Sequence, residues 1–229
     1  MPTSGAYAFN PSAGQITLYA YNLCGIRNTA LVQEHFESAR MAANLVLMDW
    51  SNRGVNLWQV ELVSVPLTQG VATYSVSPSV VYIMDAYISI TSGGTSTIDR
   101  YIIPVSRTEY ASYSNKAQQG FPTTYWHDRL LAPTITLWPV PDGNEGPLNY
   151  YAMQQVQDAN FTSGQQVDVP PIWLMAFADA LALELSYSWA GDRTDRLAGK
   201  ALRSYHAAAA TNVENADVFI SPTMSQYWR

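Results

Sequence analysis

Charged side chains are scarce in this sequence of 229 residues. Asp, Glu, Lys and Arg make up 13% of it, against the quarter that is usual in soluble domains, and uncharged polar and aromatic residues take their place. A surface so poor in charge suggests that much of it faces other protein. The 18 acidic residues outnumber the 12 basic ones. The net charge of −6 argues against sequence-independent nucleic-acid binding, which needs a broad excess of Lys and Arg.

Cysteine, lysine and long apolar runs are also nearly absent. Cys24 is the single cysteine, which excludes an intrachain disulfide and a Cys-based zinc site. Lys116 and Lys200 are the two lysines, so there is no polybasic run. The first ten residues lack the features of a signal peptide, and no stretch approaches the ~18 apolar residues of a membrane span. We therefore expect a soluble protein made in the cytoplasm, without a membrane partner.

Motifs for catalysis and cofactor binding are missing too. The only Gly-Lys pair, Gly199-Lys200, is followed by Ala and cannot form a phosphate-binding loop. No Gly-x-Ser-x-Gly elbow occurs. None of the histidines has a second histidine one helical turn away: His35, His127 and His206. We therefore expect no enzyme, no metal and no cofactor.

Apolar periodicity in the first two thirds of the chain predicts a helical start followed by strands. Residues 13–26 can form a short helix, and a long amphipathic helix is expected from an N-cap at Asn28 or Thr29 to a C-cap at Gly54. From about residue 57 to 157 the period changes to two, in short strands roughly ten residues apart. This pattern predicts an antiparallel sandwich or small barrel, with a helical turn capped by Ser106 inside it.

The helical pattern returns near the end. Asp168 is expected to cap a helix that is apolar almost all round, and Gly191-Asp192 to break it, with Asp192 capping a continuation. The long helices flank the β segment and are expected to pack together, which gives an α+β fold with an inserted β-domain. The predicted parts are a leader and long helix (1–56), an antiparallel β-domain (57–160), C-terminal helices (161–215) and an extended arm (216–229).

Four cations of the last helix recur at spacings of 3, 4 and 3, which places them on one side: Arg193, Arg196, Lys200 and Arg203. An ordinary solvated face explains this basic stripe. A contact with acidic residues of a neighbouring subunit, or with DNA passing through a ring, explains it as well. In a chain of net charge −6, subunit contact is the favoured functional interpretation.

The C-terminal arm is apolar where a solvated tail would be polar. A segment that becomes ordered on a partner through aromatic anchors explains this composition. Its candidate contact residues are Val218, Phe219, Ile220, Met224, Tyr227, Trp228 and Arg229.

The order of these features resembles the head-to-tail adaptor proteins of short-tailed bacteriophages. These are also called head-completion or packaged-DNA-stabilisation proteins and are related to tail tubular protein A. Five segments between about residues 13 and 190 carry the resemblance: "LVLMDWSNRGVNLWQVE", the strand pair "VPLTQGVATYSV", "IIPVSRTEYASYSNKAQQGFPTTYW", the hairpin "ITLWPVPDG…LNYYAM" and "PPIWLMAFADALALELS". The last helix and the arm match the family only in kind.

The resemblance implies a structural protein at the head–tail junction of a virion. Such adaptors form a ring, typically of twelve subunits, beneath the portal protein after DNA packaging. The ring extends the DNA channel, helps to retain the packaged DNA and presents a surface for the tail nozzle or fibre proteins. Double-stranded DNA passes through without sequence-specific binding. The resemblance also implies that the C-terminal arm docks on the portal.

Two other functions stay open at this point. Trp138, Tyr150 and Tyr151 can stack on sugar rings, as in a carbohydrate- or receptor-binding module of a phage tail, although strand aromatics more often pack in a core. His127 beside Asp128 is the one neighbourhood that offers residues to a cell-wall-degrading enzyme.

Overall fold

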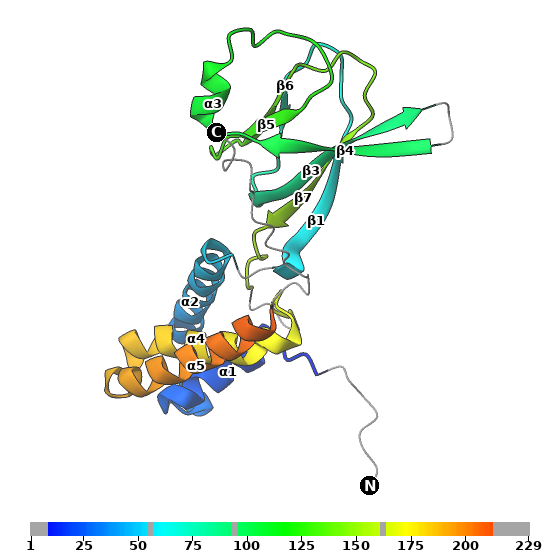
Figure 1. Ribbon diagram of the computed structural model, residues 1–229. Coiled ribbons are helices and arrows are strands. Elements are labelled where there is room, and N and C mark those ends of the chain that lie inside the picture. Colours follow the sequence, from blue (N-terminus) through cyan, green and yellow to red (C-terminus); the bar gives the residue numbers. More distant parts are fainter. Residues whose placement is uncertain (1–8, 55–56, 93–95, 161–163, 213–229) are drawn as a thin grey trace, which may run out of the picture.

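The computed structural model describes residues 9–54, 57–92, 96–160 and 164–212, which form a helical module and a β-domain joined by a neck (Figure 1). Helices from both sides of the β segment share one apolar core, and the β-domain has a second core of its own. The predicted α+β fold with an inserted β-domain is therefore confirmed.

The helices of the described residues are α1 (Ala13–Cys24), α2 (Gln33–Asn52), α3 (Arg107–Ser112), α4 (Pro171–Trp189) and α5 (Thr194–Thr211), with 3₁₀ turns η1 (Asn28–Ala30), η2 (Leu57–Gln59) and η3 (Gly191–Arg193). The strands are β1 (Val60–Val65), β2 (Thr73–Ser75), β3 (Val80–Ser92), β4 (Ser96–Pro104), β5 (Thr124–His127), β6 (Thr134–Trp138) and β7 (Leu148–Gln154).

The long helix α2 begins later than its sequence indicates. Neither Asn28 nor Thr29 caps it, because both lie in the 3₁₀ turn η1 and the chain is extended at Val32. The backbone amide of Val32 instead donates to Nδ1 of His35, at 3.3 Å. Val32 and Phe36, which continue the apolar spacing of this helix toward its start, are 56% and 36% exposed. The buried face of α2 thus begins at Ala39.

The caps expected for α4 and α5 are also corrected. Asp168 lies ahead of α4, which starts at Pro171 with Pro170 as its N-cap residue. Asp192 belongs to η3 and does not cap α5, which starts at Thr194. In contrast, Ser106 caps α3 as expected, since its hydroxyl accepts the amide of Glu109 at 3.1 Å.

Helix α4 is the centre of the helical module. It contacts α1, where the thiol of Cys24 donates to the carbonyl of Ala182 at 3.3 Å. It contacts α2 and α5 through Trp173, whose ring centroid lies 4.9 Å from Trp50 and 5.7 Å from Tyr205. Because three helices cover it, α4 can be apolar almost all round, as the sequence predicts.

The β-domain is one seven-stranded, curled sheet with the order β1-β7-β3-β4-β5-β6-β2. All neighbours are antiparallel except β4 and β5, which pair in parallel. Strands β6 and β7 are not neighbours, so the expected hairpin of residues 135–153 is wrong; β7 pairs with β1 and β3. The expected pair of β1 and β2 is also wrong, since these strands form the two ends of the sheet.

The neck fixes the β-domain to the helical module through Asp168. Its carboxylate accepts a hydrogen bond from the Gln59 side chain at 2.5 Å and one from the Gln157 amide at 3.3 Å. Its carbonyl accepts the indole N–H of Trp58, at 3.2 Å. Both chain crossings of the neck are thus tied to Asp168, just before α4.

Candidate functional site

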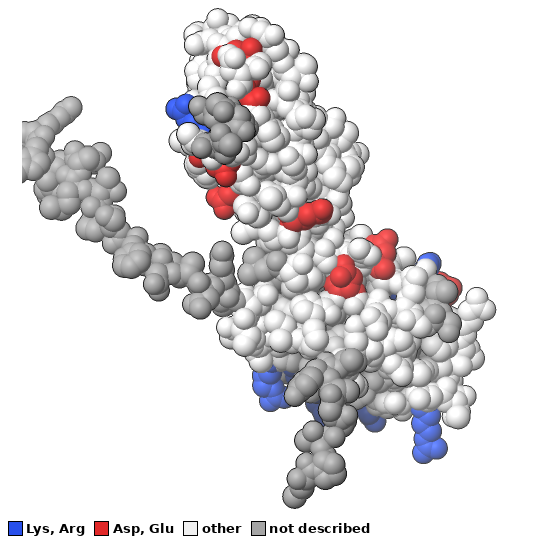
Figure 2. Space-filling view, turned by 90° about the vertical axis from the view of Figure 1, so that its right-hand side faces the viewer, with Lys and Arg blue, Asp and Glu red and all other residues white. Residues whose placement is uncertain are grey.

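The cations of the basic stripe have different surroundings in the structure. In Figure 2, several Lys and Arg side chains lie along the lower face of the helical module, whereas Asp and Glu side chains lie mainly at the neck and on the β-domain, which also carries basic side chains. Two members of the stripe hold the fold together, Arg193 and Lys200. The other two are exposed and have no hydrogen-bond or ion-pair partner within the described residues, Arg196 and Arg203.

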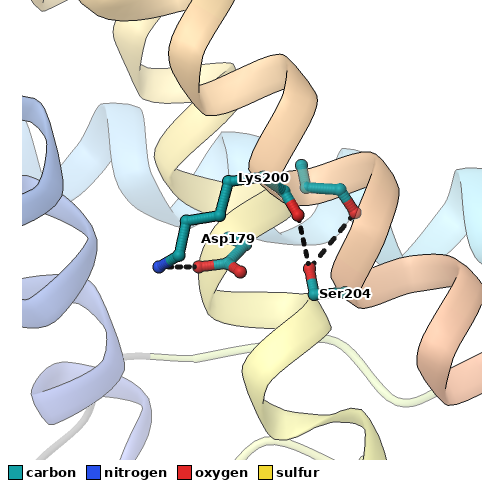
Figure 3. Close-up of polar contacts among 4 residues, drawn as sticks. Asp179, Lys200 and Ser204 are labelled. Carbon is teal, nitrogen blue, oxygen red and sulfur yellow. Dashed lines mark hydrogen bonds and ion pairs between the residues drawn. The ribbon is translucent and has the colours of Figure 1, made fainter.

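Lys200 is used inside the subunit. Its Nζ lies 2.7 Å from Oδ1 of Asp179 on α4, and the Asp179 side chain is 1% exposed (Figure 3). The same ammonium lies 5.6 Å from the ring centroid of Tyr19 on α1. Burial lowers the pKa of Lys200, but the hydrogen bond and the charge of Asp179 outweigh burial and leave this pKa raised. The interaction joins three helices around the one buried charge of α4.

Arg193 covers the C-terminal end of α1. One guanidinium nitrogen, Nη1, donates to the carbonyl of Leu23 at 3.4 Å, where helix carbonyls lack intrahelical partners. The guanidinium lies over Gly25, where an added Cβ would be 2.5 Å from Cζ of Arg193. Gly25 also has a φ of 85°, which favours glycine. Arg193 thus caps α1 from η3, and only Arg196 and Arg203 remain for a neighbouring subunit, a contact that stays a prediction.

An apolar groove of about 430 Å³ runs between α2 and α5, with α4 as its floor. Its walls expose leucines, since Leu45 on α2 is 54% and Leu202 on α5 is 57% exposed. One end is bounded by Tyr205 and by Arg53, whose guanidinium lies 5.0 Å from the tyrosine ring centroid. Its lining residues are Leu45, Val46, Asp49, Trp50, Arg53, Ala180, Leu183, Glu184, Ala198, Ala201, Leu202 and Tyr205. Such grooves between helices accept apolar segments.

The turn between β5 and β6 carries two exposed leucines, Leu130 at 68% and Leu131 at 100%. Asp128 supports the turn, because its carboxylate accepts the amide and the hydroxyl of Thr134, at 2.5 and 2.8 Å. We call Leu130 and Leu131 the leucine tip. The sequence analysis did not single them out. Two adjacent leucines within a turn are nevertheless unusual, because turn positions are mostly taken by Gly, Pro, Asn, Asp or Ser.

Most residues considered for sugar binding or hydrolysis have structural roles; Tyr151 is the exception, since it is 40% exposed and lies beside Tyr87 with ring centroids 6.4 Å apart. Tyr150 is 2% exposed, and Trp138 stacks on Tyr113 with ring centroids 4.2 Å apart. Burial, together with the charge of Arg129, lowers the pKa of His127. Its neighbour Asp128 is engaged by the turn. Among the described residues there is no cluster of three metal-ligating side chains, and no helix could cross a membrane.

Residues 27–223 match a family model described as SU10 adaptor protein. The chain belongs to this family. The matched residues extend from η1 through the β-domain, α4 and α5, and so include the last helix, for which the sequence alone showed no family pattern. No curated protein matches the chain.

Membership of the SU10 adaptor family identifies a structural adaptor protein of a bacteriophage, a virion component and not an enzyme. This confirms the phage-adaptor part of the resemblance. The expected C-terminal arm (216–229), with its candidate portal-docking residues, lies outside the described residues. The family model matches the chain only as far as residue 223, which lies within this arm.

Proposed function

We propose that this protein is the head-to-tail adaptor of a short-tailed bacteriophage. Its subunits form a ring beneath the portal protein, of twelve copies as is typical of the adaptors it resembles. The ring extends the DNA channel, helps to retain the packaged DNA and docks the tail nozzle or fibre proteins. Membership of the SU10 adaptor family supports the adaptor role.

The observation that carries the ring is that one subunit exposes unlike surfaces in two modules. The helical module presents the apolar groove and the cations Arg196 and Arg203, and the β-domain presents the leucine tip. A two-fold dimer joins two copies of the same patch, whereas a head-to-tail ring needs two different patches on each subunit. Unlike surfaces on the two modules of one subunit therefore favour the ring.

We assign the surfaces to partners by their chemistry. Arg196 and Arg203 contact acidic residues of the next subunit, and the apolar arm of residues 216–229 docks on the portal. The leucine tip contacts the tail nozzle or fibre proteins. The net charge of −6 suits a channel through which double-stranded DNA slides without sequence-specific binding, because an acidic protein repels phosphates overall.

The test combines purified protein with purified portal rings of the same phage and images the product by electron microscopy. We expect a second ring stacked on the portal with the full chain, and bare portals when residues 216–229 are deleted. Protein that stays monomeric and leaves the portal bare, with and without the arm, contradicts the proposal.

The basic pair is tested in the same assay with Arg196→Glu/Arg203→Glu. We expect fewer complete rings, because like charges then face the acidic neighbour. The matched control is Arg40→Glu, since Arg40 is an exposed helical arginine of the same module whose partner Glu37 lies on its own helix at 3.6 Å. Equal ring yields for both variants remove Arg196 and Arg203 from the interface.

A further inference from the structure

The apolar groove has an incomplete helical packing arrangement. Its floor is α4 and its walls are α2 and α5, so the position where a further apolar segment would pack is open. Apolar side chains gain from removal from water in proportion to the area covered, and Leu45 and Leu202 leave more than half of their surface exposed there. Binding of an apolar segment that covers both leucines would therefore be favourable.

The end of the groove indicates where an occupant enters. Tyr205 and Arg53 bound one end, and Tyr205 lies on α5 six residues before Thr211, the last residue of that helix. Six residues of helix rise about 9 Å. The seven residues from Thr211 to Val218 reach about 23 Å when extended, so the chain after α5 can turn back and enter the groove at this end.

The sequence after α5 has the composition that the groove requires. Val218-Phe219-Ile220 is a run of three large apolar residues, and Asp217 directly precedes it. When the run enters past Tyr205, Asp217 passes Arg53. Arg53 forms an ion pair with Asp49 at 2.6 Å and still has guanidinium N–H groups for a second carboxylate.

We propose that the groove binds Val218-Phe219-Ile220 of the chain's own C-terminal segment before assembly. The tether makes docking intramolecular, with an effective concentration in the millimolar range for so short a connection. This contact rests on the proposed function in one respect: it keeps the apolar arm covered until the portal competes for it. A free subunit thus avoids exposing the anchors that it needs later.

The first experiment is disulfide cross-linking in the free, full-length protein without portal. Leu45→Cys/Phe219→Cys places one thiol on the groove wall and one in the run. The control, Glu34→Cys/Phe219→Cys, uses an exposed position eleven residues earlier on α2, about 16 Å away along the helix. Native Cys24 is buried and gives the same background in both variants.

We expect the Leu45 pair to form an oxidised monomer at least about tenfold faster than the Glu34 pair, because docking holds the thiols together. A cross-linked dimer in place of the monomer shows that the groove takes the run of a second copy, and overturns the proposal. Equal rates for the two pairs overturn it as well.

The second experiment measures amide hydrogen exchange and needs no cysteine. In full-length Phe219→Asp, we expect residues 45–53 and 198–205 to exchange about tenfold faster than in the unsubstituted protein, because the groove opens to water. The control Met224→Asp changes a residue outside the run and should leave exchange unchanged. Unchanged exchange in Phe219→Asp contradicts docking. Both experiments omit the portal. Their failure would therefore not contradict the proposed adaptor ring, and a failure of portal binding would not contradict docking of the run in the groove.

Discussion

Lys200 on α5 lies 2.7 Å from Asp179 on α4, and the Asp179 carboxylate is almost completely buried. One of its oxygens, Oδ1, takes the ammonium, while Oδ2 has no hydrogen-bond partner among the described residues. A buried charge with so few partners depends on its counter-ion, since desolvation is otherwise uncompensated. Asp179 thus makes Lys200 a structural residue, whereas Arg196 and Arg203 of the same helix are exposed.

The first prediction is that Lys200→Met destabilises the protein by about 3 kcal/mol, the low end for a broken buried pair because Lys200 is 30% exposed. The double variant Asp179→Leu/Lys200→Met should recover most of this loss, since it removes both charges. Urea unfolding followed by circular dichroism measures both. A double variant as unstable as Lys200→Met contradicts the pair as the cause.

The second prediction concerns the pH dependence of the same pair. The folded pKa of Lys200 is raised above its ordinary value of 10.5, so the pair contributes fully below that value and its contribution is lost as the pH rises through the folded pKa. The difference in unfolding free energy between the unsubstituted protein and Lys200→Met should therefore shrink above about pH 10.5. A difference that stays constant through this range rules the linkage out.

The third prediction contrasts two glycines. Gly25→Ala should cost about 1–2 kcal/mol from the left-handed backbone alone, and more from contact with Arg193. Gly199→Ala should stabilise the protein by about 0.5–1 kcal/mol, because Gly199 lies in α5 with no atom within 4 Å of an added Cβ. Thermal and urea unfolding of both variants check the signs, and a stabilising Gly25→Ala is the outcome that contradicts the capping role of this turn.

Local chemistry made much of the fold predictable. The cap of α3 by Ser106 and the burial of α4 both follow from short-range patterns. Strand pairing did not follow, because the partners of β7 are β1 and β3, which lie more than fifty residues away in the sequence. Nearby strands such as β6 and β7 then look like a hairpin although they belong to different parts of the sheet.

The candidate site was predictable only in its residue types. The spacing of Lys200 correctly placed it on a face of α5, but its partner Asp179 is found only once α4 and α5 pack together. The groove combines α2 with α4 and α5, which the β-domain separates in sequence. In sequence, Arg193 has the same spacing as Arg196 and Arg203. Only the structure shows that Arg193 differs from them, because it contacts the end of α1.

The fourth prediction follows from the lowered pKa of His127. Burial and Arg129 lower this pKa below the ordinary 6.5, and Asp128 opposes them. His127 therefore binds a proton more tightly in the unfolded chain than in the folded protein. The unfolding free energy is thus retained above the unfolded pKa and falls as the pH drops below about 6.5. We expect His127→Phe, which also removes the unpartnered buried Nε2, to lose less stability between pH 7 and pH 5. Parallel curves for the two proteins contradict this role.

The fifth prediction is that Leu130→Ser/Leu131→Ser leaves folding unchanged but weakens tail attachment. Both side chains are largely exposed, so the unfolding free energy should change by no more than about 0.5 kcal/mol. If the leucine tip contacts the nozzle or fibre proteins, rings of this variant should still form on the portal and bind those proteins at least about tenfold more weakly, because two apolar anchors are lost. Pull-down of tail proteins by portal–adaptor complexes measures the binding.

The control is Val71→Ser, which changes an apolar residue elsewhere in the β-domain that is 39% exposed. Equal binding by both variants would assign tail docking to another surface.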